Sequence, residues 1–397
     1  MSDNRAVALP DARTLSRATR GAYLVFIGAG LGFATWAARI PQARAELGLT
    51  PGELGMVLLA IALGALLAMP AAGLIVHRLG AARTIVVMSL LTSAGLTIAG
   101  VGVLVGVVPV VIGLALMGFG SGAWDVAMNV EAAAVEQQLQ RSIMARFHAG
   151  FSVGTVIGAL IGAGMNALGV SVTVNLLAVA AFLAIAMPLS TRSFLPAGTG
   201  DHTEVGVARH PLKAWTEPRT LLIGLFVLTM AFSEGTATDW LGVAAIDGYG
   251  ATAALGSLAY GVFVTSMTVG RWYGPQVLDR FGRVPVLRAS AAGALVGLLI
   301  VVQGPNLGTA MLGTVLWGLG TALGFPVGMS AAADQRSAAA GRVSVVATIG
   351  YVAFLSGPPL IGLLGDRVGV LRALSVTAGL LAVGLLVASS TRRIDED

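Results

Sequence analysis

The chain lacks cysteine altogether, so it can form neither a disulfide bond nor a thiolate metal site. Histidine is also scarce, and none of the 4 histidines stands at metal-ligand spacing from another. We therefore expect no metal ion and no cofactor. The sequence shows neither a nucleophile–base pair nor a phosphate-binding loop, which argues against an enzyme.

Charge is the second scarcity. Only 11% of the residues are charged, whereas a soluble domain averages about 25%. With 56% hydrophobic residues and a mean hydropathy of +0.86, the chain needs a lipid bilayer to cover its apolar surface. Its pI near 10.2 does not indicate a nucleic-acid partner, because the basic residues lie in short connections between apolar segments.

The apolar segments predict an all-α membrane protein of twelve transmembrane helices. One sizeable polar stretch, 191–218, contains the only lysine and separates six spans from six. We predict a first half over 1–190, a cytoplasmic linker over 191–218 and a second half over 219–397. The predicted spans are 21–42, 53–76, 83–105, 107–135, 143–166, 170–190, 219–246, 253–277, 284–303, 306–333, 342–364 and 369–390.

The distribution of basic residues predicts the orientation. With the N-terminus in the cytoplasm, 19 of the 24 arginines and lysines fall on the inner side. The first twenty residues are polar and basic, so we expect no cleavable signal. The sequence thus predicts a multi-pass protein of the cell (inner) membrane with both termini in the cytoplasm.

The two halves repeat each other. The GFGS of residues 118–121 returns as GLGT at 318–321, and the loop at 73–83 has a counterpart at 274–283. A repeat of six spans is typical of secondary transporters whose halves rock about a site at the midplane.

The loop at 274–283 resembles the signature loop of the major facilitator superfamily, through Asp279, Arg280, Gly282 and Arg283. The first-half copy departs from that pattern, because His77 stands where the family has the aspartate. Residues 362–369 repeat the pattern on the outer side. The resemblance implies the superfamily's fold, two six-helix halves with pseudo-two-fold symmetry, and a small-molecule substrate. The fourth span looks more loosely like that of the fucose-permease-like branch of proton-coupled symporters.

These loops carry the candidate gate. An aspartate at the end of one helix can bind arginines and the positive end of a neighbouring helix, holding one side of the protein shut. In the first half Glu131 or Glu136 would have to replace the missing aspartate. The alternative is that these arginines only obey the positive-inside rule. The candidate gating residues are Arg78, Arg83, Glu136, Asp279, Arg280 and Arg283.

Asp125 is a carboxylate near the middle of the fourth span, with Asn129 one helical turn further on the same face. Its repeat-mate is Phe325, which cannot titrate. A carboxyl group that alternates between water and an apolar environment can load and release a proton, so we expect Asp125 to couple transport to protons. The alternative is a structural carboxylate tied to an arginine or to backbone donors.

Other intramembrane polar residues extend the candidate site. In the superfamily the first helix of each half lines the cavity, so the resemblance implies that Glu234 in the seventh span is a substrate or proton group. Asp239, nearer the outer end, is either a substrate ligand or an outer gate residue. Arg39 could pair with an acidic residue of the seventh span, hold a substrate anion or extend to the headgroups. His148 could relay protons or make a structural hydrogen bond. We expect Arg271 to partner an internal carboxylate or to act as a latch residue, rather than to bind substrate.

Aromatic residues at similar heights suggest a cavity wall, although each could equally serve helix packing. The candidate substrate-binding residues are Trp36, Arg39, Trp124, Asn129, Asp239, Trp240 and Phe325, with Trp317 close by. Four glycines at every fourth position of 150–162 form a flat ridge. We expect this ridge to pack against the other half.

The combined prediction is a monomeric secondary active transporter that imports a small polar solute by proton-coupled symport. One alternative is proton-driven efflux of amphipathic compounds. Another is a membrane receptor built on a transporter scaffold, which would need no titratable group in its cavity.

Overall fold

The computed structural model describes residues 11–140, 143–195, 213–334 and 339–393. Within these ranges the regular structure is helical, and eleven helical segments are long and apolar enough to cross a membrane. The predicted all-α membrane architecture is therefore confirmed.

The first half of the chain contains α1 (Ala12–Ala37), α2 (Ile40–Leu47), α3 (Pro51–Val105), α4 (Val107–Leu139), α5 (Met144–Ala167) and α6 (Val172–Thr191). The second half contains η1 (Lys213–Thr216), α7 (Pro218–Tyr249), α8 (Ala253–Phe281), α9 (Arg283–Gln303), α10 (Leu307–Thr321), α11 (Gly324–Ala332), α12 (Ala339–Val368), α13 (Val370–Ala373), α14 (Ser375–Val387) and η3 (Ala388–Thr391).

The predicted count of twelve spans agrees with these eleven segments once α3 is considered. This helix has 55 residues, more than a bilayer needs, and Gly80 within it has the non-helical dihedrals φ 77° and ψ 162°. Its two parts correspond to the predicted second and third spans. The predicted tenth span is interrupted in turn, because Ala322 and Leu323 separate α10 from α11.

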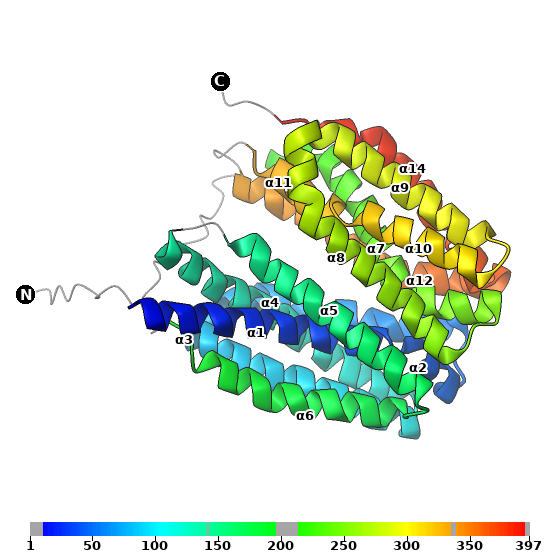
Figure 1. Ribbon diagram of the computed structural model, residues 1–397, viewed down its shortest axis with the longest axis horizontal. Helices are drawn as coiled ribbons and strands as arrows, with labels where there is room; N and C mark the ends of the chain where they lie inside the picture. Colours follow the sequence, from blue (N-terminus) through cyan, green and yellow to red (C-terminus); the bar gives the residue numbers. More distant parts are fainter. Residues whose placement is uncertain (1–10, 141–142, 196–212, 335–338, 394–397) are drawn as a thin grey trace, which may run out of the picture.

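The helices form two groups, α1–α6 and α7–α14, and the described ends of the chain lie at the same end of the molecule (Figure 1). We call this the terminal end, and the opposite end, where α2 lies, the distal end. The predicted linker is only partly visible, because 196–212 lies outside the described residues. The boundaries of the two halves therefore stay a prediction.

The repeated glycine motif has a packing reason in both halves. A Cβ atom on Gly118 of α4 would lie 2.2 Å from the carbonyl oxygen of Ile61 in α3. A Cβ atom on its repeat-mate Gly318 would lie 2.5 Å from the carbonyl oxygen of Phe263 in α8. Each glycine thus lets α4 or α10 approach a neighbouring backbone directly, as small residues do between membrane helices.

The glycine ridge of α5 packs differently from our expectation. A Cβ atom on Gly154 would lie 2.1 Å from the carbonyl oxygen of Ile27, and one on Gly162 would lie 2.5 Å from Cβ of Ala38. Both partners belong to α1 or its end, in the same half. The prediction that this ridge contacts the other half is wrong, because α1 occupies it.

Candidate transport cavity

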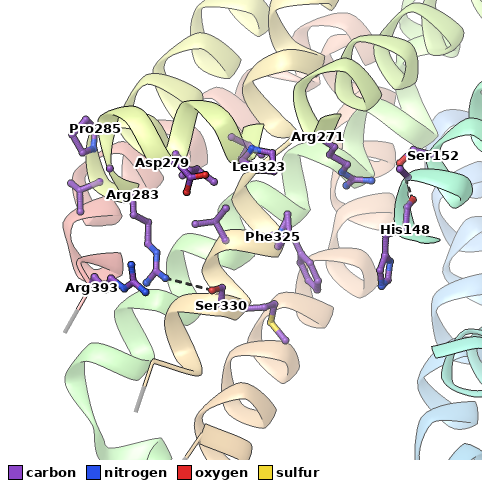
Figure 2. A pocket seen from close by; sticks show the side chains of 18 of the residues that line it. His148, Ser152, Arg271, Asp279, Arg283, Pro285, Leu323, Phe325, Ser330 and Arg393 are labelled. Atoms are coloured by element: carbon purple, nitrogen blue, oxygen red, sulfur yellow. Dashed lines mark hydrogen bonds between the residues drawn. The ribbon is translucent and has the colours of Figure 1, made fainter. Parts of the chain in front are cut away.

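A cavity of about 1610 Å³ lies between the two groups of helices. Side chains of α4 and α5 line it from the first half, and those of α8, α9 and α11 line it from the second. Arg392 and Arg393, at the described C-terminus, also line it, so the cavity extends to the terminal end. Figure 2 shows part of its wall.

The distal end is held together by direct contacts between the halves. Arg44 Nη1 lies 2.5 Å from Asp247 Oδ2, joining α2 to α7. Ser257 of α8 donates to the carbonyl oxygen of Ala38 at 2.5 Å and accepts from Asn166 Nδ2 of α5 at 2.6 Å. These polar bonds connect four elements at one level and oppose separation of the halves there.

A carboxylate at the same end binds the start of a helix in the other half. Asp366, near the end of α12, accepts a hydrogen bond from the backbone N–H of Gly52 at 3.0 Å. Gly52 is in the first turn of α3, where N–H groups have no partner within the helix and negative charge is favourable. A Cβ atom there would lie 2.2 Å from Asp366 Oδ2, so glycine lets the carboxylate approach the backbone in this position.

Asp125 faces the cavity. Its side chain is exposed and lines the cavity wall from α4. Within the described part of the chain, no basic side chain makes an ion pair with it. The Asn129 side chain donates to the carbonyl oxygen of Asp125 at 2.9 Å and reaches Oδ1 at 3.5 Å. Asp125 is thus a free carboxylate in a space open to water.

Glu234 of α7 binds Arg271 of α8, as expected for an intramembrane cation. Nη2 of Arg271 lies 3.1 Å from each carboxylate oxygen of Glu234. Nε of Arg271 donates to the carbonyl oxygen of Ala322 at 3.3 Å. That carbonyl lies at the break between α10 and α11, where the helix does not satisfy it. Arg271 therefore stabilises the break and neutralises Glu234.

His148 and Phe325 lie on opposite walls of the cavity. His148 of α5 is exposed and within electrostatic reach of Arg271 across the halves. Figure 2 shows the Arg271 side chain extending towards His148 and Ser152, with Phe325 of α11 near the same gap. Phe325 lines the cavity together with its predicted repeat-mate Asp125.

Arg39 does not take part in this cavity. It is 1% exposed and donates to the side chain of Asn166 and to the carbonyl oxygen of Val170, both in the first half. This corrects the expectation of a pair with an acidic residue of the seventh span. Arg39 is near the turn between α1 and α2, where these acceptors bind both of its Nη groups, while its buried Nε has no hydrogen-bond partner among the described residues.

Three of the four predicted aromatic ligands are packed inside the protein. Trp36 is 2% exposed, Trp124 is 1% exposed and Trp240 is 0% exposed. They do not line the cavity in this conformation, which corrects the proposed aromatic wall to Phe325 alone among the four. Trp317 is also buried, where Nε1 donates to Ser233 at 2.7 Å.

Asp239 is partly buried in α7 and is not among the residues that line the cavity. It lies within electrostatic reach of Tyr260 of α8, which is 2% exposed. It lies nearer the distal end than Glu234, and its two expected roles, substrate ligand and outer gate residue, stay predictions.

The second-half gating candidates lie beside the cavity. Asp279 is exposed on its wall. The guanidinium of Arg280 lies 5.1 Å from the ring centroid of Phe281, a cation–π contact. Arg283 donates to both oxygens of Asp334, at 3.0 and 2.9 Å. Because the cavity separates the halves at this end, a latch there is not formed in this conformation.

The first-half candidates have other partners. Glu136 accepts hydrogen bonds from the backbone N–H groups of Ile143 at 2.6 Å and Met144 at 2.5 Å, so it caps the start of α5. Glu131 accepts from the N–H of Leu195 at 3.0 Å. Neither glutamate binds Arg78 or Arg83, which are exposed. This corrects the idea that these glutamates replace the missing aspartate, because backbone donors lie closer.

Sequence reasoning did not single out Asp334. Its carboxylate accepts from Arg219 at 2.9 Å as well as from Arg283, and so joins the start of α7 to that of α9. The polar residue Ser152 also lines the cavity. Its place on the same face of α5 as His148, one helical turn away, was the available signal.

Comparison with known proteins gives one consistent result. The profile of the Major Facilitator Superfamily matches residues 22–347. An uncharacterized MFS-type transporter of Yersinia pestis is 32% identical over 375 residues, covering 94% of each chain. A bacterial homologue of the human lysosomal transporter Spinster, solved in an inward-facing and unoccupied conformation, has a TM-score of 0.77 at 12% identity, over 98% of this chain and 100% of that one. The fucose:proton symporter FucP of E. coli has a TM-score of 0.63 at 15% identity, over 96% and 100%.

Proposed function

Because the chain belongs to the major facilitator superfamily and is a membrane transporter, we propose that it moves a small polar solute by proton-coupled symport. The observation that carries the coupling is Asp125, a free carboxylate exposed in the cavity between the halves. An unpaired charge at membrane depth is costly, and a water-filled transport path is where such a group is tolerated. The protein acts as a monomer in this proposal.

The distribution of basic residues supports an orientation for this cavity. The termini lie in the cytoplasm, which places the terminal end inside the cell and the distal end outside. The described conformation is then inward-open, in an inner membrane. Its fold similarity to a transporter solved in an inward-facing state is consistent with this assignment.

Alternating access follows from the arrangement of contacts. Arg44–Asp247, Asp366–Gly52 and the bonds of Ser257 hold the outer side shut while the inner side is open. In the outward-open state these contacts separate and the inner side closes. Asp279 is then placed to meet the other half, so the proposed inner latch forms only in that state.

Proton transfer needs a group that meets both aqueous phases in turn. Asp125 meets the inner phase here, and rocking of the halves would expose it to the outer one. Glu234 and His148 are the further proton groups of the proposal, the first held by Arg271 and the second exposed on the opposite wall.

Asp125→Asn tests the coupling in proteoliposomes. The amide imitates the protonated acid, so we expect accumulation driven by a pH gradient to be lost while solute exchange continues. A structural role predicts instead a protein that neither binds nor exchanges solute. Glu46→Gln, which neutralises an exposed carboxylate of α2, is the matched control.

Accumulation that keeps the wild-type dependence on the pH gradient in Asp125→Asn would show that Asp125 is not the carrier. The same assay separates import from efflux, because an acidic exterior drives accumulation by a symporter and depletion by an antiporter. A receptor would bind the solute without either response.

A further inference from the structure

One edge of the Arg271 guanidinium is unused by the protein. Nε is bound to the Ala322 carbonyl oxygen and Nη2 to both oxygens of Glu234. Nη1 makes no hydrogen bond to any other described residue, and it is not among the buried polar atoms. Arg271 itself lines the cavity. Two charged N–H donors therefore face a water-accessible space in a fixed orientation.

The surroundings of this edge favour negative charge. Leu323, just before α11, and Phe325 and Pro326 in its first turn line the cavity together with Arg271, and the start of a helix carries partial positive charge. His148 faces the same guanidinium from α5. An anion placed between Arg271 and His148 would therefore contact both halves of the protein.

The cavity as a whole has an excess of cationic side chains. Two carboxylates line it, Asp125 and Asp279, against five arginines. Two of the five are paired, Arg283 with Asp334 and Arg271 with Glu234, so three other arginines face two carboxylates and leave a small positive excess. Such a field raises the local concentration of anions and speeds their entry. The arginines are Arg271, Arg283, Arg288, Arg392 and Arg393.

We propose that the transported solute carries a carboxylate, and that Arg271 binds it through the free edge of its guanidinium. This rests on the proposed transport function and names the class of its substrate. Nη1 can donate charge-assisted hydrogen bonds to a carboxylate in an orientation fixed by the bonds of Nε and Nη2, which a flexible lysine ammonium would not reproduce.

The same geometry couples the solute to a proton. With Glu234 ionised, Arg271 is already neutralised, and a second carboxylate would leave the site with one excess negative charge. A proton on Glu234 removes that excess, so the anion enters together with the proton. The other groups facing this site are Tyr260 of α8 and His148 of α5. Asp239 is on the same helix as Glu234 and further from the cavity.

Binding to the purified protein tests the inference without any transport step. The probes are carboxylates with their neutral counterparts: glucuronate with glucose, lactate with lactamide, and benzoate with benzamide. We expect at least one acid to raise the melting temperature of the wild type where its neutral counterpart does not. Its affinity should increase as the pH falls. If no acid exceeds its neutral counterpart, the inference is overturned.

Variants then locate the site. Arg271→Gln with Glu234→Gln removes both charges at once, which avoids an unpaired charge in the membrane. We expect it to fold and to bind the acid at least about tenfold more weakly. Arg271→Lys should lose most of the affinity as well. The control, Arg372→Gln, removes an exposed arginine of α13 and should bind like the wild type.

Glu234→Gln alone tests the coupling to protons. It should keep acid binding and lose its pH dependence. Unchanged pH dependence in Glu234→Gln, or unchanged affinity in the double variant, would contradict the inference. Failure of the proposed function is a separate result, namely pH-driven accumulation that is unaffected in Asp125→Asn.

Discussion

Two charged residues at membrane depth, one cationic and one anionic, have very different surroundings. Arg39 is buried and its two Nη groups donate to Asn166 and Val170, whereas Asp125 is exposed in the cavity with no basic partner in the described ranges. The sequence identifies both as unusual, because charge in an apolar segment is costly. It does not show which helix face each occupies, since these helices are apolar on all sides. For the same reason, the sequence could not predict that Phe325 lines the cavity and Trp124 does not.

Glu136 gives a prediction at this scale. Glu136→Ala should lower the free energy of unfolding by about 1–2 kcal/mol, because two backbone N–H groups at the start of α5 lose their acceptor. The melting temperature in detergent measures the loss. Gln137→Ala, at an exposed neighbouring position, is the control. A shift in the accessibility of cavity positions with no change in melting temperature would instead indicate a gating role.

At the scale of elements, the three signature-like loops share a backbone conformation. Gly80, Gly282 and Gly369 have φ of 77°, 79° and 83°, with ψ of 162°, 163° and 147°. This region is open to glycine and strained for other residues. The sequence repeat therefore encodes a joint between consecutive helices as well as a set of charges. His77 changes the charge of the first loop but leaves its joint intact.

Gly282→Ala should destabilise the protein by about 1–3 kcal/mol, because alanine is strained at these dihedral angles. It should also displace Arg283 from Asp334, since Arg283 follows the joint directly. Thermal unfolding in detergent measures the effect. Gly73→Ala in α3 has open space around its Cβ position, so it should be neutral or slightly stabilising. Equal stability of the two variants would contradict the strain argument.

At the scale of elements, the sequence predicted where the spans lie but not which helices pack against each other. Apolar length was enough to predict the spans that precede and follow Gly80 and Gly282. The partner of the α5 ridge was not predictable, because a face of glycines fits any closely approaching helix. α1 takes that place, with the Ile27 carbonyl oxygen where a Cβ of Gly154 would lie. The break at Ala322 did have a signal in the sequence, because Pro326 lacks the N–H that would bind the Ala322 carbonyl oxygen four residues earlier.

At the scale of the whole molecule, the two ends differ in how the halves meet. Among the described residues the distal end has one ion pair and several hydrogen bonds between the halves, and the terminal end has the cavity. The sequence predicted a latch on the inner side and a similar motif at 362–369 on the outer side. It did not predict which of the two makes contact with the other half in the described conformation. A transporter sequence must encode two conformations of similar free energy, so no pattern within it selects one.

The substitution Asp366→Ala tests the contact between Asp366 and the start of α3 at the distal end. Losing the carboxylate at the start of α3 should cost the closed distal end about 1 kcal/mol and raise the share of the outward-open state about fivefold. Single cysteines introduced on the cavity wall report the change, because the chain has no native cysteine. Labelling from the inner side should fall. The neighbouring Arg367→Gln, at an exposed position, should leave it unchanged, and equal labelling in both variants would rule out this role for Asp366.

The Arg44–Asp247 pair makes the closure of the distal end sensitive to salt concentration. The side chains are 19% and 34% exposed, so dissolved electrolyte reaches them. Screening shortens the range of such an attraction to about 8 Å at physiological ionic strength and to about 3 Å at 1 M. In the orientation proposed above, this pair faces the growth medium. A saline environment would therefore loosen the outer closure and a dilute one would tighten it, making the turnover of the protein sensitive to external salinity without a dedicated sensor.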